Sequence, residues 1–239
     1  MIALRNVRKQ YKTKKGTRVI LDDITYEFVP GTNVGILGRN GAGKSTLLRI
    51  IGGSEMPNSG YVERNAKLSW PLGFSGGFNM KISGRENMRF ICRLYNEDYH
   101  RVSEFVEEFA ELGDYLDMPV STYSSGMKAK LAFGVSMAFD FSYYLIDEVT
   151  AVGDAIFRQK SKAFFEARRA SATLIVVSHS MATIKTLCDT MLVLHKGKLL
   201  SFPTNEEAEV FYNEVCCGKK PRRTMQRQGP KSTQTAALS

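Results

Sequence analysis

The most informative stretch of this chain is Gly38-Arg39-Asn40-Gly41-Ala42-Gly43-Lys44-Ser45, residues 38–45. It follows the apolar run 33–37 and leads into the run 46–51, whose apolar residues have helical spacing. A buried strand, a glycine-rich turn and an amphipathic helix in this order form the context that a phosphate-binding loop requires. An ordinary glycine-rich link would not account for all four fixed positions of that motif. The stretch therefore predicts a site for a nucleoside triphosphate.

The residue types in this loop suit phosphate chemistry. Its glycines can adopt positive φ, so the backbone can approach a ligand without an intervening Cβ. The N–H groups of the turn and the positive end of the following helix then point at the same anion. Lys44 adds a charge for the β- and γ-phosphates, and Ser45 offers a hydroxyl to Mg²⁺. We expect the nucleotide to be bound by Gly38, Arg39, Asn40, Gly41, Ala42, Gly43, Lys44, Ser45 and Thr46.

The composition indicates a folded protein without a membrane span or a secretion signal. With 239 residues, 43% of them apolar, the chain can form a sizeable core. No apolar run is long enough to cross a bilayer, and the N-terminus lacks the apolar segment of a secretory signal. Cys92 and Cys188 fall in helical patterns and Cys216 and Cys217 are adjacent, which matches no disulfide or zinc spacing. We expect a cytosolic protein or one peripheral to a membrane.

The net charge of +9 is concentrated at the two ends. Residues 1–18 carry +7 and residues 218–239 carry +6, neither with any acidic residue, so the body between them carries −4. A basic surface of the kind that binds nucleic acid is therefore not expected over the body. The segment 218–239 is rich in polar residues and proline and predicts a disordered tail, which can be a solvated end or can be attracted to anionic lipid or polysaccharide.

The N-terminal part contains β-strand patterns. Residues 2–11 and 18–29 read as two strands joined by a charged turn, and residues 60–63 and 67–70 as a second short strand pair. Tyr11 ends the first strand near the phosphate-binding loop. It can stack on the purine ring of the nucleotide or cover an apolar face, and the sequence leaves both interpretations open.

Residues 83–139 have a helical pattern instead. The segment Ser83-Gly84-Arg85-Glu86 has the spacing of a capping box, and residues 102–109 place apolar side chains at i, i+3, i+4 and i+7. The absence of a β pattern predicts a helical subdomain of about 83–139 inserted into a nucleotide-binding domain of 1–217. Its apolar stripe is interpreted as core.

The second half alternates apolar strands with helices. Residues 141–146 run into Asp147-Glu148, and residues 173–177 run into Ser178-His179. Uninterrupted apolar runs predict parallel strands that are covered on both faces. The remaining elements are helices at 155–169 and 181–188, a hairpin at 191–202 turning at Lys196-Gly197, and a helix from Thr204 to about 215. The predicted fold class is α/β, a P-loop NTPase core with a mostly parallel sheet, an N-terminal antiparallel β-subdomain and an inserted α-helical subdomain.

Three of the predicted strands end at residues that suit nucleotide hydrolysis, namely Gly38, Asp147-Glu148 and His179. Ligands gather at the carboxyl ends of parallel strands, which would bring Asp147, Glu148 and His179 to the phosphate-binding loop. Asp147 can hold Mg²⁺ opposite the Ser45 hydroxyl, and Glu148 can orient and deprotonate an attacking water. His179 can hydrogen-bond the γ-phosphate or that water. A single histidine at a strand end is more often structural, but its alignment with two other such strands favours the functional role.

A second turn precedes the helical pattern 128–139, and it reads Tyr123-Ser124-Ser125-Gly126-Met127. Ser124 or Ser125 would cap that helix, as serine does in many proteins. The turn can also be a second helix terminus that binds phosphate. Because the chain already has one phosphate-binding loop, this terminus would serve the nucleotide of a second subunit.

The order of these motifs resembles that of the ATP-binding cassette (ABC) ATPases. Their signature turn is usually Leu-Ser-Gly-Gly-Gln, of which Ser124 and Gly126 keep the Ser and the second Gly. The stretch 147–157, the Ser-Ser-Gly-Met turn and Leu68-Ser69-Trp70-Pro71 are similar to one branch, the ATPase subunits of capsular-polysaccharide exporters. The resemblance covers about residues 2–215.

The resemblance implies an ATP- and Mg²⁺-dependent ATPase that works as a homodimer in head-to-tail contact. The residues expected to face the other subunit's nucleotide are Ser124, Ser125, Gly126 and Met127, and Asp154 would communicate across the contact. Further implied partners are a separate membrane permease and a capsular polysaccharide, at the cytoplasmic face of the inner membrane. The lack of room for a C-terminal sugar-binding domain favours the capsule type over the O-antigen type.

The sequence departs from the family at the glycine-rich stretch 72–80. The family commonly has a glutamine there that contacts Mg²⁺ and the membrane partner. Counting without gaps puts Phe74 at that place, and Asn79 is the nearest amide. Phe74, Phe78 and Met80 can line a groove for the permease or can pack internally.

Two other functions are weighed against transport. A cassette that acts on nucleic acid or ribosomes is suggested by the pI of about 9.4. Such proteins usually pair two cassettes, however, and this chain has one phosphate-binding loop and an acidic body. A nucleotide kinase would leave residues 124–126 and Asp154 without a role. We expect transport, with no nucleic-acid partner.

Overall fold

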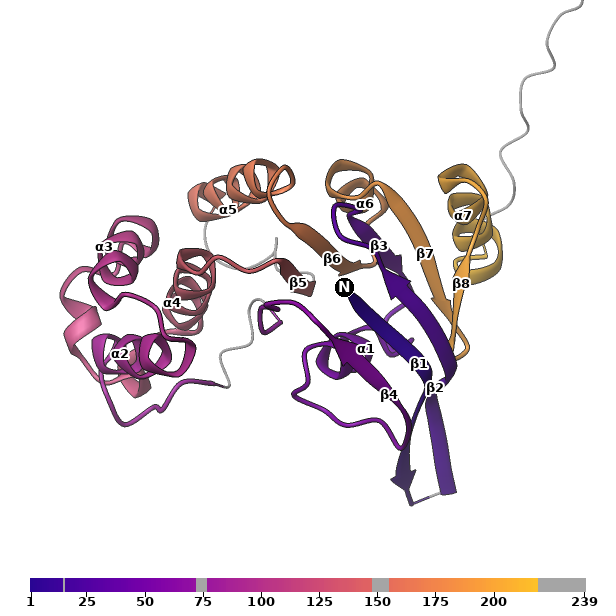
Figure 1. Cartoon of the computed structure of the whole chain (residues 1–239), viewed down its shortest axis with the longest axis horizontal. Coiled ribbons are helices and arrows are strands. Elements are labelled where there is room, and N and C mark those ends of the chain that lie inside the picture. The colour runs from indigo at the N-terminus through magenta and orange to yellow at the C-terminus, as the bar shows by residue number, and fades with distance from the viewer. Residues whose placement is uncertain (15, 72–76, 148–154, 219–239) are drawn as a thin grey trace, which may run out of the picture.

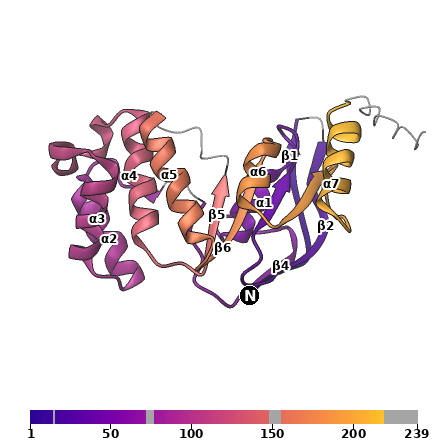
Figure 2. The ribbon, with the colours of Figure 1, turned by 90° about the horizontal axis from the view of Figure 1, so that it is seen from above.

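The computed structural model describes residues 1–14, 16–71, 77–147 and 155–218 of the chain. Strands and helices form two lobes, with the sheets and α1, α6 and α7 in one lobe and α2, α3 and α4 in the other (Figure 1). The view from above shows α5 beside α4, next to the lobe of helices (Figure 2). Of the predicted tail, residues 218–239, all but Gly218 lie outside the described residues.

The larger sheet is mostly parallel, as its uninterrupted apolar runs predict. Its strand order is β5-β6-β3-β7-β8, and only the β7–β8 hairpin is antiparallel. The strands are β3 (Val34–Leu37), β5 (Tyr143–Asp147), β6 (Thr173–Ser178), β7 (Thr190–His195) and β8 (Lys198–Ser201). All residues of β3 and β6 are buried, because helices cover both faces of the sheet.

The N-terminal sheet is antiparallel, with order β2-β1-β4. It consists of β1 (Ile2–Thr13), β2 (Gly16–Phe28) and β4 (Ser59–Arg64). Its inner residues, among them Leu4 and Phe28, share one apolar core with Leu47 and Leu48 of α1 and Leu145 of β5. This core holds the N-terminal sheet against the face of the parallel sheet that carries α1.

One predicted strand pair is wrong. Residues 67–70 do not pair with β4; instead Leu68 forms a parallel bridge with Tyr143 of β5. The Ser69 N–H donates to the Tyr143 carbonyl at 2.9 Å, and the Ser69 hydroxyl accepts from the Leu145 N–H at 2.9 Å. The segment thus satisfies backbone groups at the edge of the parallel sheet, which a local pattern cannot reveal.

The helices are α1 (Lys44–Ile51), α2 (Gly84–Tyr95), α3 (Tyr99–Ala110), α4 (Ser125–Ala138), α5 (Ala155–Arg168), α6 (Met181–Leu187) and α7 (Asn205–Phe211). Two short 3₁₀ segments (Gly113–Asp117 and Val120–Thr122) precede α4, and a π turn (Tyr212–Cys216) follows α7. The predicted capping box is confirmed, since the Ser83 hydroxyl accepts from the Glu86 N–H and the Glu86 carboxylate accepts from the Ser83 N–H.

Helix α6 packs very closely on β3. A Cβ added to Gly35 would lie 2.4 Å from Cγ2 of Ile184, a distance that real contacts do not reach. Glycine is therefore required in the strand that leads into the phosphate-binding loop. None of the helices described above has the length and apolar character needed to cross a lipid bilayer.

Candidate nucleotide-binding site

The parallel sheet brings the predicted strand ends together. In the register, Leu37 of β3 lies beside Ser178 of β6, and Asp147 of β5 lies beside Val177. Gly38, Asp147 and His179 therefore emerge at the same edge of the sheet, as parallel strands require. Glu148 and Asp154 fall outside the described residues, so their predicted roles remain predictions.

The phosphate-binding loop needs glycine at its last turn. Gly43 is the N-cap of α1 and has φ of 104°, a conformation that other residues rarely adopt. A Cβ there would lie 2.7 Å from Cγ2 of Ile20 on β2. No side chain caps α1, so its first N–H groups are available to an anionic ligand.

Lys44 is held at the centre of the loop. Only 8% of the surface of Lys44 is exposed. Its ammonium donates to the Gly38 carbonyl at 2.7 Å and to the Arg39 carbonyl at 3.3 Å. These contacts keep a charge directed at the concave side of the loop. Burial of the residue also strengthens its attraction to a phosphate, because water screens the interaction less.

A nucleotide pocket of about 390 Å³ opens at this loop. Asp147 and Ser45 both line it, so a carboxylate and a hydroxyl approach the same space. Hard oxygen donors of this kind suit Mg²⁺, which usually completes its coordination with phosphate oxygens and water. The pocket is lined by Arg18, Ile20, Asn40, Gly41, Gly43, Lys44, Ser45, Thr46 and Asp147.

Two lining residues, Arg18 and Ile20, were not predicted from the sequence. They lie on β2, and Ile20 contacts the loop where Gly43 turns. No motif marks them, because their position depends on how the N-terminal sheet packs on α1. The signal that the sequence offers is weak: Arg18 and Ile20 are a cationic and an apolar residue on the strand just before the P-loop strand.

Tyr11 has polar surroundings. Its hydroxyl donates a hydrogen bond to the Glu55 carboxylate, and the Lys9 ammonium lies 5.3 Å from the centre of its ring. Burial by itself would raise the pKa of Glu55, but hydrogen bonds from Tyr11, Lys9 and Arg49 outweigh it and lower the pKa to about 2. Tyr11 does not line the nucleotide pocket. Its polar and charged neighbours also argue against the alternative that Tyr11 covers an apolar face. Stacking on a purine stays a prediction.

His179 lies exposed just beyond β6. Its carbonyl accepts a hydrogen bond from the Tyr212 hydroxyl at 3.4 Å, which ties it to the π turn after α7. Burial raises the pKa of Tyr212 to about 12, so this hydroxyl remains a donor at neutral pH. The position of His179 at the nucleotide edge is compatible with its predicted contact to the γ-phosphate.

The signature turn forms a separate surface at the N-terminus of α4. Of the two serines predicted as possible caps, Ser124 is the N-cap, and its hydroxyl accepts from the Met127 N–H at 3.2 Å. Ser124, Gly126 and Met127 line a pocket of about 520 Å³ that shares no residue with the nucleotide pocket. Tyr123, where the family usually has leucine, is buried and donates to the Tyr115 carbonyl at 2.5 Å. The turn is thus shaped by its own lobe.

The glycine-rich stretch before α2 is described only from residue 77 onward, so Phe74 lies outside the described residues. Asn79 is held by Asn87 of α2, whose amide oxygen accepts from the Asn79 N–H at 2.8 Å. Phe78 and Met80 are partly buried and pack against the core of the helical lobe. These contacts favour internal packing of Phe78 and Met80 over an open groove.

This fold and this site define a class of protein, the P-loop NTPases, in which a parallel sheet presents a phosphate-binding loop and a strand-end acidic residue at one edge. Residues 21–151 match the family described as ABC transporter. The chain belongs to the ABC transporter family, and it is an ATP-binding protein of the ATP-hydrolysing kind.

The relatives are similar over nearly their whole length. The chain is 49% identical over 215 residues to the capsule polysaccharide export ATP-binding protein CtrD of Neisseria meningitidis, covering 90% of this chain and 100% of the relative. It is 49% identical to the ATP-binding protein BexA of Haemophilus influenzae, covering 90% and 99%. It is 46% identical to the polysialic acid transport ATP-binding protein KpsT of Escherichia coli, covering 88% and 95%.

Solved structures share the fold. An ATP-binding subunit of an ABC transporter superposes with a TM-score of 0.75 at 20% identity, covering 89% of this chain and 93% of that chain. A dimeric ATP-binding cassette bound to ADP and phosphate superposes with a TM-score of 0.72 at 19% identity, covering 85% and 100%. The predicted fold class is thereby confirmed.

Proposed function

We propose that this chain is the ATP-hydrolysing subunit of an ABC exporter that drives capsular polysaccharide, or a related glycolipid-linked polysaccharide, across the cytoplasmic membrane. The observation that carries this proposal is 46–50% identity over 82–90% of the chain to three relatives named for capsule or polysialic acid export. A relative named for O-antigen export is only 32% identical, which favours the capsule branch.

ATP binding uses the loop and helix geometry described above. The N–H groups of residues 41–46 surround the phosphates, and the Lys44 ammonium exchanges its carbonyl partners for β- and γ-phosphate oxygens. Ser45 and Asp147 would hold Mg²⁺, which neutralises charge on the phosphate oxygens when it is bound. Ile20 and Arg18 border the nucleotide from β2.

Hydrolysis needs a positioned water and charge stabilisation. Glu148 follows Asp147 directly and accepts a proton from the attacking water, while His179 hydrogen-bonds the γ-phosphate from the neighbouring strand. The signature pocket shares no residue with the nucleotide pocket of the same chain. A second copy of the chain therefore supplies Ser124 and Gly126 to complete the site. Each nucleotide is then held between two subunits, Asp154 signals between them, and closure of the dimer becomes dependent on ATP.

A movement driven by this closure requires a membrane partner. A separate permease would receive it on the side of the helical lobe, and the ATPase would lie at the cytoplasmic face of the inner membrane as a peripheral subunit. The domain organisation proposed for this purpose is a nucleotide-binding domain of residues 1–217, with residues about 83–139 inserted and a basic tail at 218–239.

The sharpest test changes only the predicted general base. Glu148→Gln keeps the size of the side chain but cannot take a proton, so ATP hydrolysis should slow by ~10²–10⁴-fold while ATP still binds. Glu166→Gln, on the exposed side of α5, is the matched control and should hydrolyse ATP at the original rate. Unimpaired turnover by Glu148→Gln would remove this residue from its role.

The transport branch needs a cellular test. In a capsulated strain that lacks this chain, the original protein should restore polysaccharide at the cell surface, and Glu148→Gln should leave polymer inside at equal protein level. Export restored equally by both would contradict ATP-driven transport. Surface polymer that never depended on this chain would contradict the polysaccharide assignment.

A further inference from the structure

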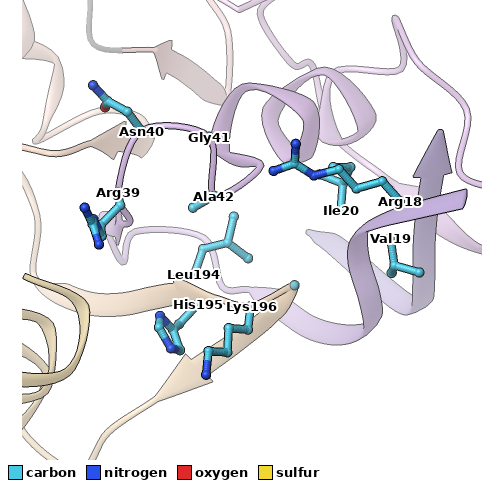
Figure 3. Close-up of a pocket in the computed structure, with 11 residues that line it drawn as sticks. Arg18, Val19, Ile20, Arg39, Asn40, Gly41, Ala42, Leu194, His195 and Lys196 are labelled. Carbon is cyan, nitrogen blue, oxygen red and sulfur yellow. The ribbon is translucent and has the colours of Figure 1, made fainter. Parts of the chain in front are cut away.

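A second pocket lies beside the nucleotide pocket, between the phosphate-binding loop and the β7–β8 hairpin (Figure 3). We call it the hairpin pocket, and its walls are residues 18–20 of β2, 39–42 of the loop and 194–197 of the hairpin. Its volume is about 470 Å³, within the range of sites for small organic ligands. The two pockets share Arg18, Ile20, Asn40 and Gly41, so the loop is a common wall.

The rim of the hairpin pocket is cationic. Arg18, Arg39 and Lys196 come from three different elements, and none of the described residues that line the pocket carries a carboxylate. In the described part of the chain these three side chains form no ion pair. By contrast, Lys198 on the same hairpin is neutralised by Asp22 at 3.2 Å. Positive charges around one rim without a counter-charge favour an anionic ligand.

The floor of the pocket is apolar. Figure 3 shows Ala42 and Leu194 between the side chains of Arg39 on one side and Arg18 on the other. Ile20 of β2 and Ala42 of the loop are half-buried and supply the apolar surface that a ligand can reach, while Leu194 lies beneath them and is 1% exposed. A cationic rim over an apolar floor suits a ligand that has both an anionic group and a compact apolar body.

The walls of the pocket are fixed by contacts outside it. The Asp22 N–H donates to the Gly197 carbonyl at 2.9 Å, which ties the tip of the hairpin to β2. Behind the hairpin, Cys216 Sγ lies 3.3 Å from Nδ1 of His195, so the π turn supports the same wall. A pocket with walls held in this way pays little ordering entropy when it binds a ligand.

We propose that the hairpin pocket binds a second phosphorylated small molecule, with its phosphate or diphosphate at the cationic rim formed by Arg18, Arg39 and Lys196 and its apolar body on Ile20 and Ala42. A nucleotide and a phosphorylated lipid-type alcohol share this chemistry. Because residues 39–42 form one wall, the bound ligand holds the segment that contacts ATP in the adjacent pocket. The site therefore couples a second ligand to ATP affinity.

The test measures binding rather than hydrolysis, so its result is independent of the proposed export function. The full chain with Lys44→Ala, which disables the nucleotide pocket, is titrated by calorimetry with ADP, geranyl diphosphate and inorganic pyrophosphate. We expect ADP or geranyl diphosphate to bind more tightly than pyrophosphate, since pyrophosphate has no apolar body. Preference for ADP identifies a nucleotide site, and preference for geranyl diphosphate identifies a site for a lipid-type phosphate.

Two double variants locate the binding. Lys196→Gln in the Lys44→Ala background should weaken the preferred probe ~10-fold or more, the loss of one charge-assisted hydrogen bond. Lys198→Gln in the same background removes a cation from the same hairpin but from outside the pocket, and should leave affinity unchanged. Glutamine tolerates the left-handed conformation of residue 196, where φ is 48°, about as well as lysine.

Several results would overturn the proposal. They are no binding of any probe to Lys44→Ala, pyrophosphate binding as tight as that of the other two, or equal loss in both double variants. The same titration on the original chain saturated with a non-hydrolysable ATP analogue repeats the test without the Lys44 substitution. A second binding event that Lys196→Gln weakens and Lys198→Gln does not is the expected result there as well.

Discussion

The N-termini of α1 and α4 expose their backbone N–H groups in different ways. Helix α1 has Gly43 as its N-cap, and no side chain accepts from its first turn. Helix α4 has Ser124 as its N-cap, and the serine hydroxyl already accepts from the Met127 N–H at 3.2 Å. The first helix end therefore gains its remaining hydrogen bonds from a ligand, whereas the second is partly satisfied by its own chain.

The surroundings of the two helix ends differ in the same sense. Lys44 is buried at the first end and Asp147 lines the same pocket, so charge for a phosphate and its metal is in place. The second end presents the uncharged residues Ser124, Gly126 and Met127, and the same pocket is lined by Glu111 and Lys130, whose charges are opposite. A helix end that is stable by itself can stay folded in a single subunit and still donate to a phosphate that another subunit brings.

The largest expected effect is on ATP binding, and it compares a lysine at the N-terminus of α1 with one at the N-terminus of α4. Lys44→Ala should abolish ATP binding in an equilibrium assay, a loss of at least ~10²-fold, because each charge-assisted hydrogen bond contributes ~1.5–3 kcal/mol. Lys128→Ala removes a lysine from the first turn of α4 and should leave binding to the single subunit unchanged. Equal loss in both variants would show that the two ends do not have different roles.

The next effect concerns the glycines. Gly43→Ala should cost ~1–3 kcal/mol of unfolding free energy and weaken ATP binding, because residue 43 has φ of 104° and its Cβ would meet Ile20 at 2.7 Å. Gly126→Ala should leave the melting temperature unchanged or raise it, since the nearest atom, Ser124 Oγ, lies 3.8 Å away. It should still lower kcat, because in the proposed dimer the new methyl group would face the partner's nucleotide. An unaltered kcat would argue against phosphate contact at α4.

A smaller effect distinguishes capping from catalysis at α4. Ser124→Ala and Ser83→Ala each remove an N-cap in the helical lobe and should lower the free energy of unfolding by ~1 kcal/mol. Only Ser124→Ala should also lower kcat, by roughly 10-fold for one lost hydrogen bond to phosphate. Urea unfolding and steady-state hydrolysis measure the two effects. If kcat falls equally in both variants, the loss reflects destabilisation of the lobe.

The smallest effect concerns the other ends of the same helices. Arg49 in the last turn of α1 pairs with Glu55 at 3.0 Å, whereas α4 has no basic residue in its last turn. Because the folded pKa of Glu55 is about 2, below its unfolded value, this stabilisation is complete above about pH 5 and is lost as the pH falls toward 2. Glu55→Gln should cost ~1 kcal/mol at pH 7, since water reaches part of this network, and progressively less in acid.

Urea unfolding of both proteins between pH 7 and pH 3.5 measures this difference. Glu214→Gln is a change of the same type in the π turn after α7. Its difference in unfolding free energy from the original protein should not become smaller as the pH falls. A constant difference between Glu55→Gln and the original protein at all pH values would contradict the role assigned to the hydrogen bonds from Tyr11, Lys9 and Arg49.

Features that depend on neighbouring residues were predictable. The phosphate-binding loop, the capping box at Ser83, the N-cap at Ser124 and the β7–β8 hairpin follow from side chains a few positions apart. The parallel sheet was predictable as well, because its apolar runs need cover on both faces. Its strand ends then predicted the meeting of Gly38, Asp147 and His179.

Features that depend on distant pairing were not predictable. Residues 67–70 have a strand pattern, but Leu68 pairs with Tyr143 of the edge strand β5 and not with β4. Arg18 and Ile20 enter the nucleotide pocket because the N-terminal sheet shares a core with α1. The polar setting of Tyr11 likewise arises from Glu55, which is 44 residues away.

The chemistry of this chain is therefore encoded locally, since helix ends, glycines and one lysine are enough to specify a place for phosphate. The walls around that place are not encoded locally. They result from packing of β2, the loop and the β7–β8 hairpin, and packing depends on the summed burial of apolar surface over the whole chain. For that reason the motif identifies the nucleotide, while the folded arrangement produces the pocket beside it and leaves the signature turn on a separate surface.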